Sequence, residues 1–128
     1  MILQLDMASS TPLYVQLRNQ IVTGIGKGTL RPGESLPTVR ALAQQAGINT
    51  MTVNKTYQIL KTEGFISIDR RHGATVAVQV NPARCREKLE GELELLCAEA
   101  AVRGISKTEF LRLCEQAFSA MAPQPQEE

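Results

Sequence analysis

Tryptophan is absent from this chain of 128 residues, and all aromatic residues together make up only 4% of it. A hydrophobic core must therefore be built from leucine, isoleucine, valine and alanine. No stretch approaches 18 consecutive apolar residues, and the chain does not open with a basic segment followed by an apolar one. We therefore expect neither a membrane-spanning helix nor a signal peptide, and we expect a cytoplasmic protein without a membrane partner.

Residues that hold metals or carry out catalysis are also scarce. His72 is the only histidine, and because no metal-binding cluster accompanies it, we interpret it as a hydrogen-bonding loop residue. Cys85, Cys97 and Cys114 form no Cys-x-x-Cys pair; we interpret them as reduced, buried packing residues, with redox sensing as the alternative. No Ser/His/Asp set, lysine-centred cofactor pocket or glycine-rich phosphate loop is present. The sequence therefore predicts no enzyme, no cofactor and no metal.

Charge is distributed unevenly along the chain. Residues 1–80 contain eight basic and four acidic side chains, a net charge of +4, whereas residues 81–128 contain six basic and nine acidic ones, a net charge of −3. Such an asymmetry is expected when only the first part of a protein contacts phosphate groups.

Three helices are predicted in the basic part. Thr11 as N-cap and Pro12 as first helical residue begin a helix that stops near Lys27. Its inward face repeats every fourth residue, at Leu13, Leu17, Ile21 and Ile25. A short second helix begins at Pro37-Thr38 and is closed by Gly47, and a third is capped by Asn49 and ends at Gly64. The tight turn between the second and third helices indicates a helix-turn-helix.

A β-hairpin is predicted to follow. Residues 65–68 and 75–80 are rich in β-branched residues, and residues 69–74 between them form a basic tip. Three helices and such a hairpin make a winged helix.

The acidic part predicts two helices, over about 83–102 and from Lys107 to Met121, separated by Gly104. Ser106 and Glu109 form a capping box at the start of the second one. The fold class is therefore mainly α with a small β-hairpin. We divide it into a winged helix-turn-helix (1–80), a two-helix dimerisation region (81–122) and a disordered tail (123–128).

The most specific motif lies between the first and third helices. It reads Gly28-x-Leu30-x-Pro32-Gly33-x-x-Leu36-Pro37-Thr38-x-Arg40-x-Leu42-Ala43, continued by Gly47-Ile48, Thr52-Val53, Leu60, Glu63-Gly64 and Ile66. With it, residues 12 to about 78 resemble the DNA-binding domain of the GntR family of bacterial transcription regulators. Two further segments resemble the YtrA-like subfamily: Pro12-Leu13-Tyr14-x-Gln16-Leu17 and Ile48-Asn49-x-Met51-Thr52-Val53-Asn54-Lys55-x-Tyr57. The resemblance implies a short two-helix tail and a repressor of its own operon.

The first turn of a recognition helix enters the major groove, a helix N-terminus favours a phosphate, and a wing tip grips phosphate or the minor groove. Asparagine pairs with adenine, and methionine can contact a thymine methyl group. The predicted DNA-binding residues are Thr38, Arg40, Asn49, Thr50, Met51, Thr52, Asn54, Lys55, Arg70, Arg71, His72 and Gly73.

Some of these residues have a second interpretation. Asn49 is first of all a helix cap, and Tyr57 is a core residue rather than a DNA contact. Met51 either contacts the groove or packs in the core, and Arg40 either contacts phosphate or is a solvated charge. Thr50 stands where many GntR members have arginine, which removes a guanine reader and favours A·T contacts. Residues 71–75 also depart from the family's Arg-Gly-x-Gly-Thr, so the hairpin tip is expected to turn differently.

The two C-terminal helices carry apolar stripes wider than two lone helices can cover. We therefore expect a homodimer, the alternative being a monomer whose helices fold back onto the winged helix. The predicted interface consists of Leu89, Leu93, Leu96, Phe110, Leu113, Cys114 and Phe118. About 45 residues are too few to enclose a sizeable pocket, and whether a small-molecule effector binds stays open.

Together these features predict a sequence-specific DNA-binding transcription regulator, a homodimeric repressor of a pseudo-palindromic operator. Its partners are double-stranded DNA and a second copy of itself. The alternative is a winged-helix adaptor for protein or RNA partners, since the fold does not dictate its partner.

Overall fold

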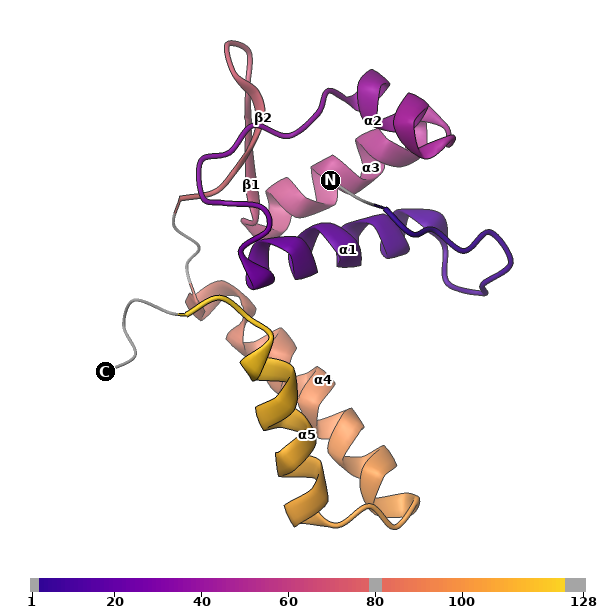
Figure 1. Cartoon of the computed structure of the whole chain (residues 1–128), viewed down its shortest axis with the longest axis vertical. Coiled ribbons are helices and arrows are strands. Elements are labelled where there is room, and N and C mark those ends of the chain that lie inside the picture. Colours follow the sequence, from indigo (N-terminus) through magenta and orange to yellow (C-terminus); the bar gives the residue numbers. More distant parts are fainter. Residues whose placement is uncertain (1–2, 79–81, 124–128) are drawn as a thin grey trace. The chain divides into compact units, whose positions relative to one another are not determined.

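The computed structural model describes residues 3–78 and 82–123, and it divides the chain into two compact units, Met1–Val80 and Asn81–Glu128 (Figure 1). The first unit contains the helices α1 (Leu13–Lys27), α2 (Val39–Ala46) and α3 (Thr50–Glu63) and the strands β1 (Ile66–Asp69) and β2 (Gly73–Val76). The second unit contains α4 (Pro82–Val102) and α5 (Lys107–Ser119). The predicted class, mainly α with one β-hairpin in a winged helix, is confirmed.

Short polar side chains fix where α2 and α3 begin. The Thr38 hydroxyl accepts the Ala41 N–H (3.1 Å), and the Asn49 side chain accepts the Met51 N–H (2.7 Å), so both predicted caps are confirmed. Gly47 and Gly64 end α2 and α3 in the left-handed conformation, with φ of 69° and 89°.

The predicted start of α1 is wrong by one residue. Pro12 has an extended ψ of 147° and is itself the N-cap, and its carbonyl accepts the N–H groups of Val15 and Gln16 (both 3.1 Å). The Thr11 carbonyl instead accepts the side-chain amide of Gln16 (2.8 Å). Thr11 is thus part of the segment that leads to the helix, because that segment is tied to α1 by glutamine side chains.

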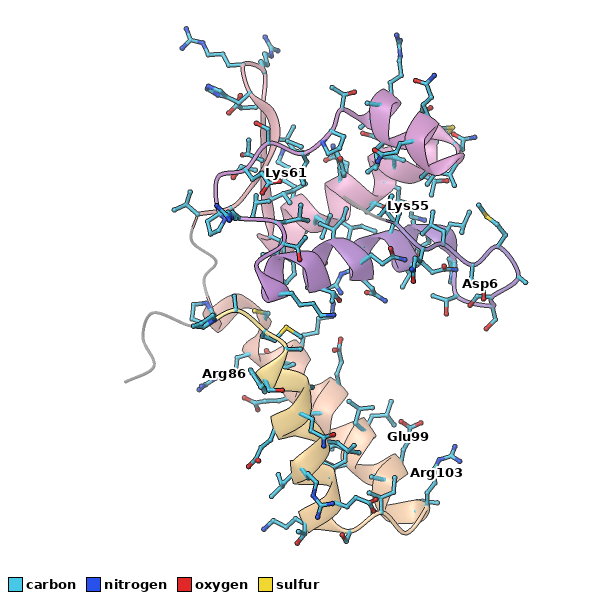
Figure 2. All side chains as sticks on the ribbon, viewed as in Figure 1. Asp6, Lys55, Lys61, Arg86, Glu99 and Arg103 are labelled. Carbon is cyan, nitrogen blue, oxygen red and sulfur yellow. The ribbon has the colours of Figure 1, made fainter. Side chains whose placement is uncertain are left out.

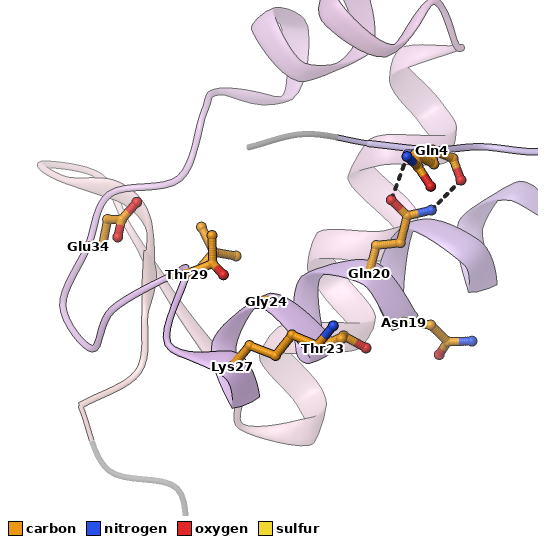
Figure 3. A pocket seen from close by; sticks show the side chains of 9 residues that line it. Gln4, Asn19, Gln20, Thr23, Gly24, Lys27, Thr29 and Glu34 are labelled. Carbon is orange, nitrogen blue, oxygen red and sulfur yellow. Dashed lines mark hydrogen bonds between the residues drawn. The ribbon is translucent and has the colours of Figure 1, made fainter. Parts of the chain in front are cut away.

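Two glutamines hold the N-terminal segment along α1. Gln20 accepts the Gln4 N–H (2.9 Å) and donates to the Gln4 carbonyl (2.6 Å), as the dashed lines in Figure 3 show. Gln16 makes the same pair of bonds to Asp6, at 2.8 and 2.9 Å. Gln4 and Asp6 are alternate residues of an extended segment, and their spacing matches that of Gln20 and Gln16, which lie one helical turn apart. Beside Gln4 and Gln20 lies a hollow of about 650 Å³, drawn in Figure 3.

The core lies between α1, α2 and α3, and the hairpin closes it. Its side chains are mostly aliphatic, as the composition requires: Leu17, Ile21, Leu42, Val53, Leu60 and Val76 are fully buried. Thr56 is also fully buried, which the sequence did not predict; its hydroxyl donates to the carbonyls of Tyr14 and Thr52 (both 3.1 Å). α3, which carries the predicted recognition residues, is therefore fixed to α1 by a polar bond as well as by packing.

The first hairpin strand begins one residue later than the sequence predicted, and the second begins two residues earlier. Residues 66–69 pair antiparallel with residues 73–76, in place of the predicted 65–68 and 75–80, of which 79–80 lie outside the described residues. The reason is a long-range partner. On the other edge of β2, the Leu36 N–H donates to the Ala74 carbonyl and the Val76 N–H donates to the Glu34 carbonyl, each at 2.8 Å. The motif segment before α2 is thus a third strand-like edge of the wing.

The second unit is a pair of helices joined by a short turn. Gly104 has a φ of 80°, and the Ser106 hydroxyl accepts the Glu109 N–H (3.1 Å), as the predicted cap requires. α5 ends at Ser119 rather than continuing through Met121, because Ala120 ends the helix and the Met121 N–H turns back to the Phe118 carbonyl (2.9 Å). The predicted tail falls almost wholly on residues 124–128, outside the described ones.

Candidate nucleic-acid interface

The first turns of α3 present a row of exposed side chains. Thr50, Met51, Asn54 and Lys55 are all exposed, and together with Val39 of α2 they line a hollow of about 390 Å³. Met51 is 76% exposed, so the interpretation of this side chain as core packing is wrong. The structure therefore brings four of the predicted site residues together on one surface.

Two neighbouring predicted residues cap helices, and a third is half-buried. The side chains of Thr38 and Asn49 are occupied as helix caps, as described above, and Thr52 is half-buried. Arg40 is exposed in the first turn of α2, and among the described residues no ion pair involves it. Arg40 is therefore the cation beside the α3 surface that remains available to an anion.

Lys55, by contrast, is held in place by an aromatic ring that sequence reasoning missed. Its ammonium lies 3.9 Å from the centroid of the Tyr14 ring, close enough for a cation–π interaction between α3 and α1. Figure 2 labels Lys55 at this place on the ribbon. The pairing directs its positive charge toward α1, which weakens its prediction as a base reader.

The hairpin tip is ordered by a carboxylate. One oxygen of Asp69 accepts the backbone N–H groups of Arg71 (2.8 Å) and His72 (2.6 Å), and the other lies 3.3 Å from Nδ1 of His72. These bonds, above all the one from the His72 backbone, hold the pKa of Asp69 below its usual range. Sequence reasoning missed this role of Asp69, although an aspartate that accepts the backbone N–H two residues later is a known turn signal.

The tip therefore presents cations in a fixed turn. Arg70, Arg71 and His72 are exposed, and Gly73 adopts a φ of 65°, which favours glycine. His72 has a hydrogen-bonding position, as predicted. No group of three metal-ligating side chains occurs in the described ranges 3–78 and 82–123.

An ion pair supports the far end of α3. Nε of Arg18 lies 2.9 Å from Oε1 of Glu63, and Nη2 lies 3.2 Å from Oε2, a two-bond arrangement that is half-buried. The Arg18 guanidinium also lies 5.6 Å from the centroid of the Phe65 ring. α1 is thereby joined both to the end of α3 and to the start of the wing.

In the second unit, the predicted interface residues leave much apolar surface uncovered. Leu89, Leu93 and Phe118 are 62%, 45% and 69% exposed, Leu96 and Leu113 are also exposed, and Phe110 and Cys114 are half-buried. Ala100 is the one buried residue in the described part of this unit. The sequence missed Leu95 and Leu111, which are likewise exposed.

Two expectations about the second unit are wrong. The cysteines are not buried: Cys97 is exposed, and Cys85 and Cys114 are half-buried, because two helices alone provide too little cover. The unit also contains a sizeable apolar hollow of about 430 Å³ between α4 and α5, lined by Cys97, Phe110 and their neighbours. Because Ala100 and Ala101 have small side chains, the two helices leave this space unfilled.

None of the helices in the described residues has the length and apolar character needed to cross a membrane.

Two bacterial transcription regulators match more than half of the chain. The chain is 33% identical over 106 residues to the transcriptional repressor YtrA of Bacillus subtilis, covering 80% of this chain and 82% of that protein. It is 37% identical over 75 residues to the transcriptional regulator Rv1152 of Mycobacterium tuberculosis, covering 59% of this chain but only 62% of that protein. This chain thus spans less than two thirds of the mycobacterial relative.

Solved structures agree with these matches. YtrA from Sulfolobus acidocaldarius, a GntR-family transcription factor, is 38% identical and covers 77% of this chain and 99% of its own, with a TM-score of 0.65. A transcriptional antiterminator from Listeria monocytogenes shares the fold over 100% of this chain and 98% of its own, with 24% identity and a TM-score of 0.83. The DNA-binding domain of AraR, solved with the operator ORX1, is 26% identical, covers 60% of this chain and 96% of its own, and has a TM-score of 0.54.

The family model of the bacterial regulatory proteins of the gntR family matches residues 13–76, which run from the start of α1 to the end of β2. This match contains α3, the wing and the motif segment that pairs with β2. With the YtrA proteins among its relatives, the chain belongs to the gntR family of bacterial regulatory proteins.

Proposed function

We propose that the protein is a sequence-specific DNA-binding repressor of transcription that acts as a homodimer on a pseudo-palindromic operator. The observation that carries the proposal is the exposed surface of Thr50, Met51 and Asn54 at the start of α3, beside the cation of Arg40. The N-terminal turns of a recognition helix of this kind read base edges in the major groove. The AraR domain, of the same fold, was solved with operator DNA.

Contacts to the DNA backbone set the position of α3 in the groove. Arg40 lies in the first turn of α2, where the helix N-terminus itself favours an anion. The hairpin tip adds Arg70 and Arg71, on the same upper side of the first unit as α2 in Figure 1. These two sites grip phosphate on either side of the recognition helix, and His72 and Gly73 allow the tip to approach a groove.

Two copies are needed because one winged helix contacts too few base pairs to select an operator. The apolar side chains of α4 and α5 supply the contact between copies, since the pair buries only Ala100 within its described residues. Covering Leu89, Leu93, Leu96 and Phe118 with a second copy removes apolar surface from water. The symmetry of such a dimer then matches an inverted repeat in the operator.

An anisotropy titration with labelled DNA from upstream of the protein's own gene tests this function, with unrelated DNA as the control. We expect clear preference for the upstream DNA and a steep loss of affinity with salt. Arg40→Ala weakens binding to both DNAs, whereas Arg103→Ala, an exposed arginine of the second unit, leaves both unchanged. Absence of binding at low salt contradicts the proposal and favours a protein-binding adaptor.

A further inference from the structure

We infer that the hollow at the start of α3 receives the 5-methyl group of a thymine, so that each half-site is specified by A·T base pairs there. This inference rests on the proposed function and names the base that the same site reads. The hollow of about 390 Å³ is formed by two helices, with Val39 from α2 and Thr50, Met51, Asn54 and Lys55 from α3.

The wall of the hollow is largely apolar. Val39 is half-buried and packs against the core, which makes it a fixed surface, whereas Met51 is 76% exposed on the opposite helix. An exposed methionine beside a fixed valine offers a flexible, polarisable partner for a small apolar group. The thymine methyl is the apolar group that base pairs present in the major groove.

The charged groups at the hollow do not suit guanine. Guanine is read through O6 and N7 by two hydrogen bonds from arginine or lysine. No arginine lines the hollow, and the only cation that lines it, Lys55, has its ammonium 3.9 Å from the centroid of the Tyr14 ring. Because the Lys55 ammonium is held at the Tyr14 ring, the hollow has no free arginine or lysine side chain that could bind guanine.

Asn54 supplies the complementary polar contact. It lies three residues after Met51, so both side chains are on the same face of α3. An asparagine amide donates to N7 and accepts from the N6 amino group of adenine. Met51 and Asn54 therefore address the two members of an A·T pair, or of adjacent pairs, from one helix face.

Removing single methyl groups from the DNA tests the inference directly. Duplexes that the 128-residue chain selects from a random-sequence library are first identified, and each thymine of the selected site is then replaced in turn by deoxyuridine. We expect at least one position in each half-site where this replacement weakens binding about threefold to fivefold, the effect of one buried methyl group. Met51→Ala reduces that difference to less than about twofold. Met7→Ala, an exposed methionine of the N-terminal segment, retains the full difference.

Three results overturn the inference. One is that deoxyuridine has no effect at any position of the selected site, and another is that Met51→Ala responds to deoxyuridine as the native protein does. Selected sites with G·C pairs at the positions that Met51→Ala affects also contradict it. If the selection enriches no sequence at all, the proposed function itself fails, and that result is distinct from the others.

Discussion

Single hydrogen bonds from buried side chains of α3 to distant carbonyl groups hold this predicted recognition helix in position. The Tyr57 hydroxyl donates to the Pro37 carbonyl (2.7 Å), which fixes α3 against the residue before the N-cap of α2. Thr56 makes a similar bond to Tyr14 of α1. These bonds connect α3 to α1 and to the segment before α2, so we expect their loss to change the geometry of the site as well as stability.

The Tyr57 bond has a pH-dependent consequence. Burial raises the pKa of Tyr57 from its ordinary 10.0 to about 12, so between these values the unfolded chain loses this proton while the folded chain keeps it. The Tyr57 contribution to the free energy of unfolding should therefore stay constant well below pH 10 and fall by roughly 3 kcal/mol between pH 10 and 12. Urea denaturation at a series of pH values measures it.

Tyr57→Phe provides the comparison. This variant should be about 1 kcal/mol less stable at pH 7, because the Pro37 carbonyl loses its donor, and it should lack the Tyr57 part of the alkaline loss. Tyr14→Phe keeps the ring beneath Lys55 and should behave like the native protein. An alkaline loss of the same size in Tyr57→Phe contradicts its assignment to this hydroxyl.

At the level of helices and strands, local signals were predicted well and long-range partners were not. Thr38, Asn49 and Ser106 act as caps because a cap depends on the next few residues only. The hairpin shifted because β2 pairs with residues 33–36, some 40 positions earlier, which no local pattern reveals. The contacts of Arg18 with Glu63 and of Tyr14 with Lys55 were missed for the same reason.

One substitution at two glycines should have opposite effects. Gly47 ends α2 with a φ of 69°, so Gly47→Ala should lower the free energy of unfolding by about 1 kcal/mol. Gly91 lies inside α4, and a Cβ added there would meet no atom within 4 Å, so Gly91→Ala should stabilise that helix by about 0.5–1 kcal/mol. Thermal denaturation followed by circular dichroism measures both. A stabilised Gly47→Ala variant contradicts the assigned cap.

The hairpin as an element should contribute charge to binding. We expect Arg70→Ala with Arg71→Ala to reduce the slope of log affinity against log salt by about 2 if both arginines contact phosphate. Affinity should fall similarly for operator and unrelated DNA, since phosphate contacts carry no sequence information. Salt-series anisotropy measures the slope, with Arg112→Ala of α5 as the control. An unchanged slope places the tip away from the DNA.

At the level of the whole molecule, the two units differ in charge and in the apolar surface that they expose. The basic first unit carries the α3 surface and the hairpin tip, and the acidic second unit carries apolar side chains on α4 and α5 that its own two helices leave exposed. Composition predicted the difference in charge, and apolar spacing predicted the apolar surface of the second unit; the roles of the two units stay a prediction. Composition and spacing did not predict the hollows, because a hollow depends on how far apart two packed helices lie.

The number of chains on one operator duplex, measured by sedimentation equilibrium, tests the proposed dimeric reader most directly. We expect two native chains per duplex, and one or none for Leu93→Asp, which places a charge in the proposed contact between copies. Val102→Asp, at an exposed valine outside the predicted interface, should still give two. One native chain per duplex, or two chains of Leu93→Asp bound as tightly as the native protein, would contradict the proposal.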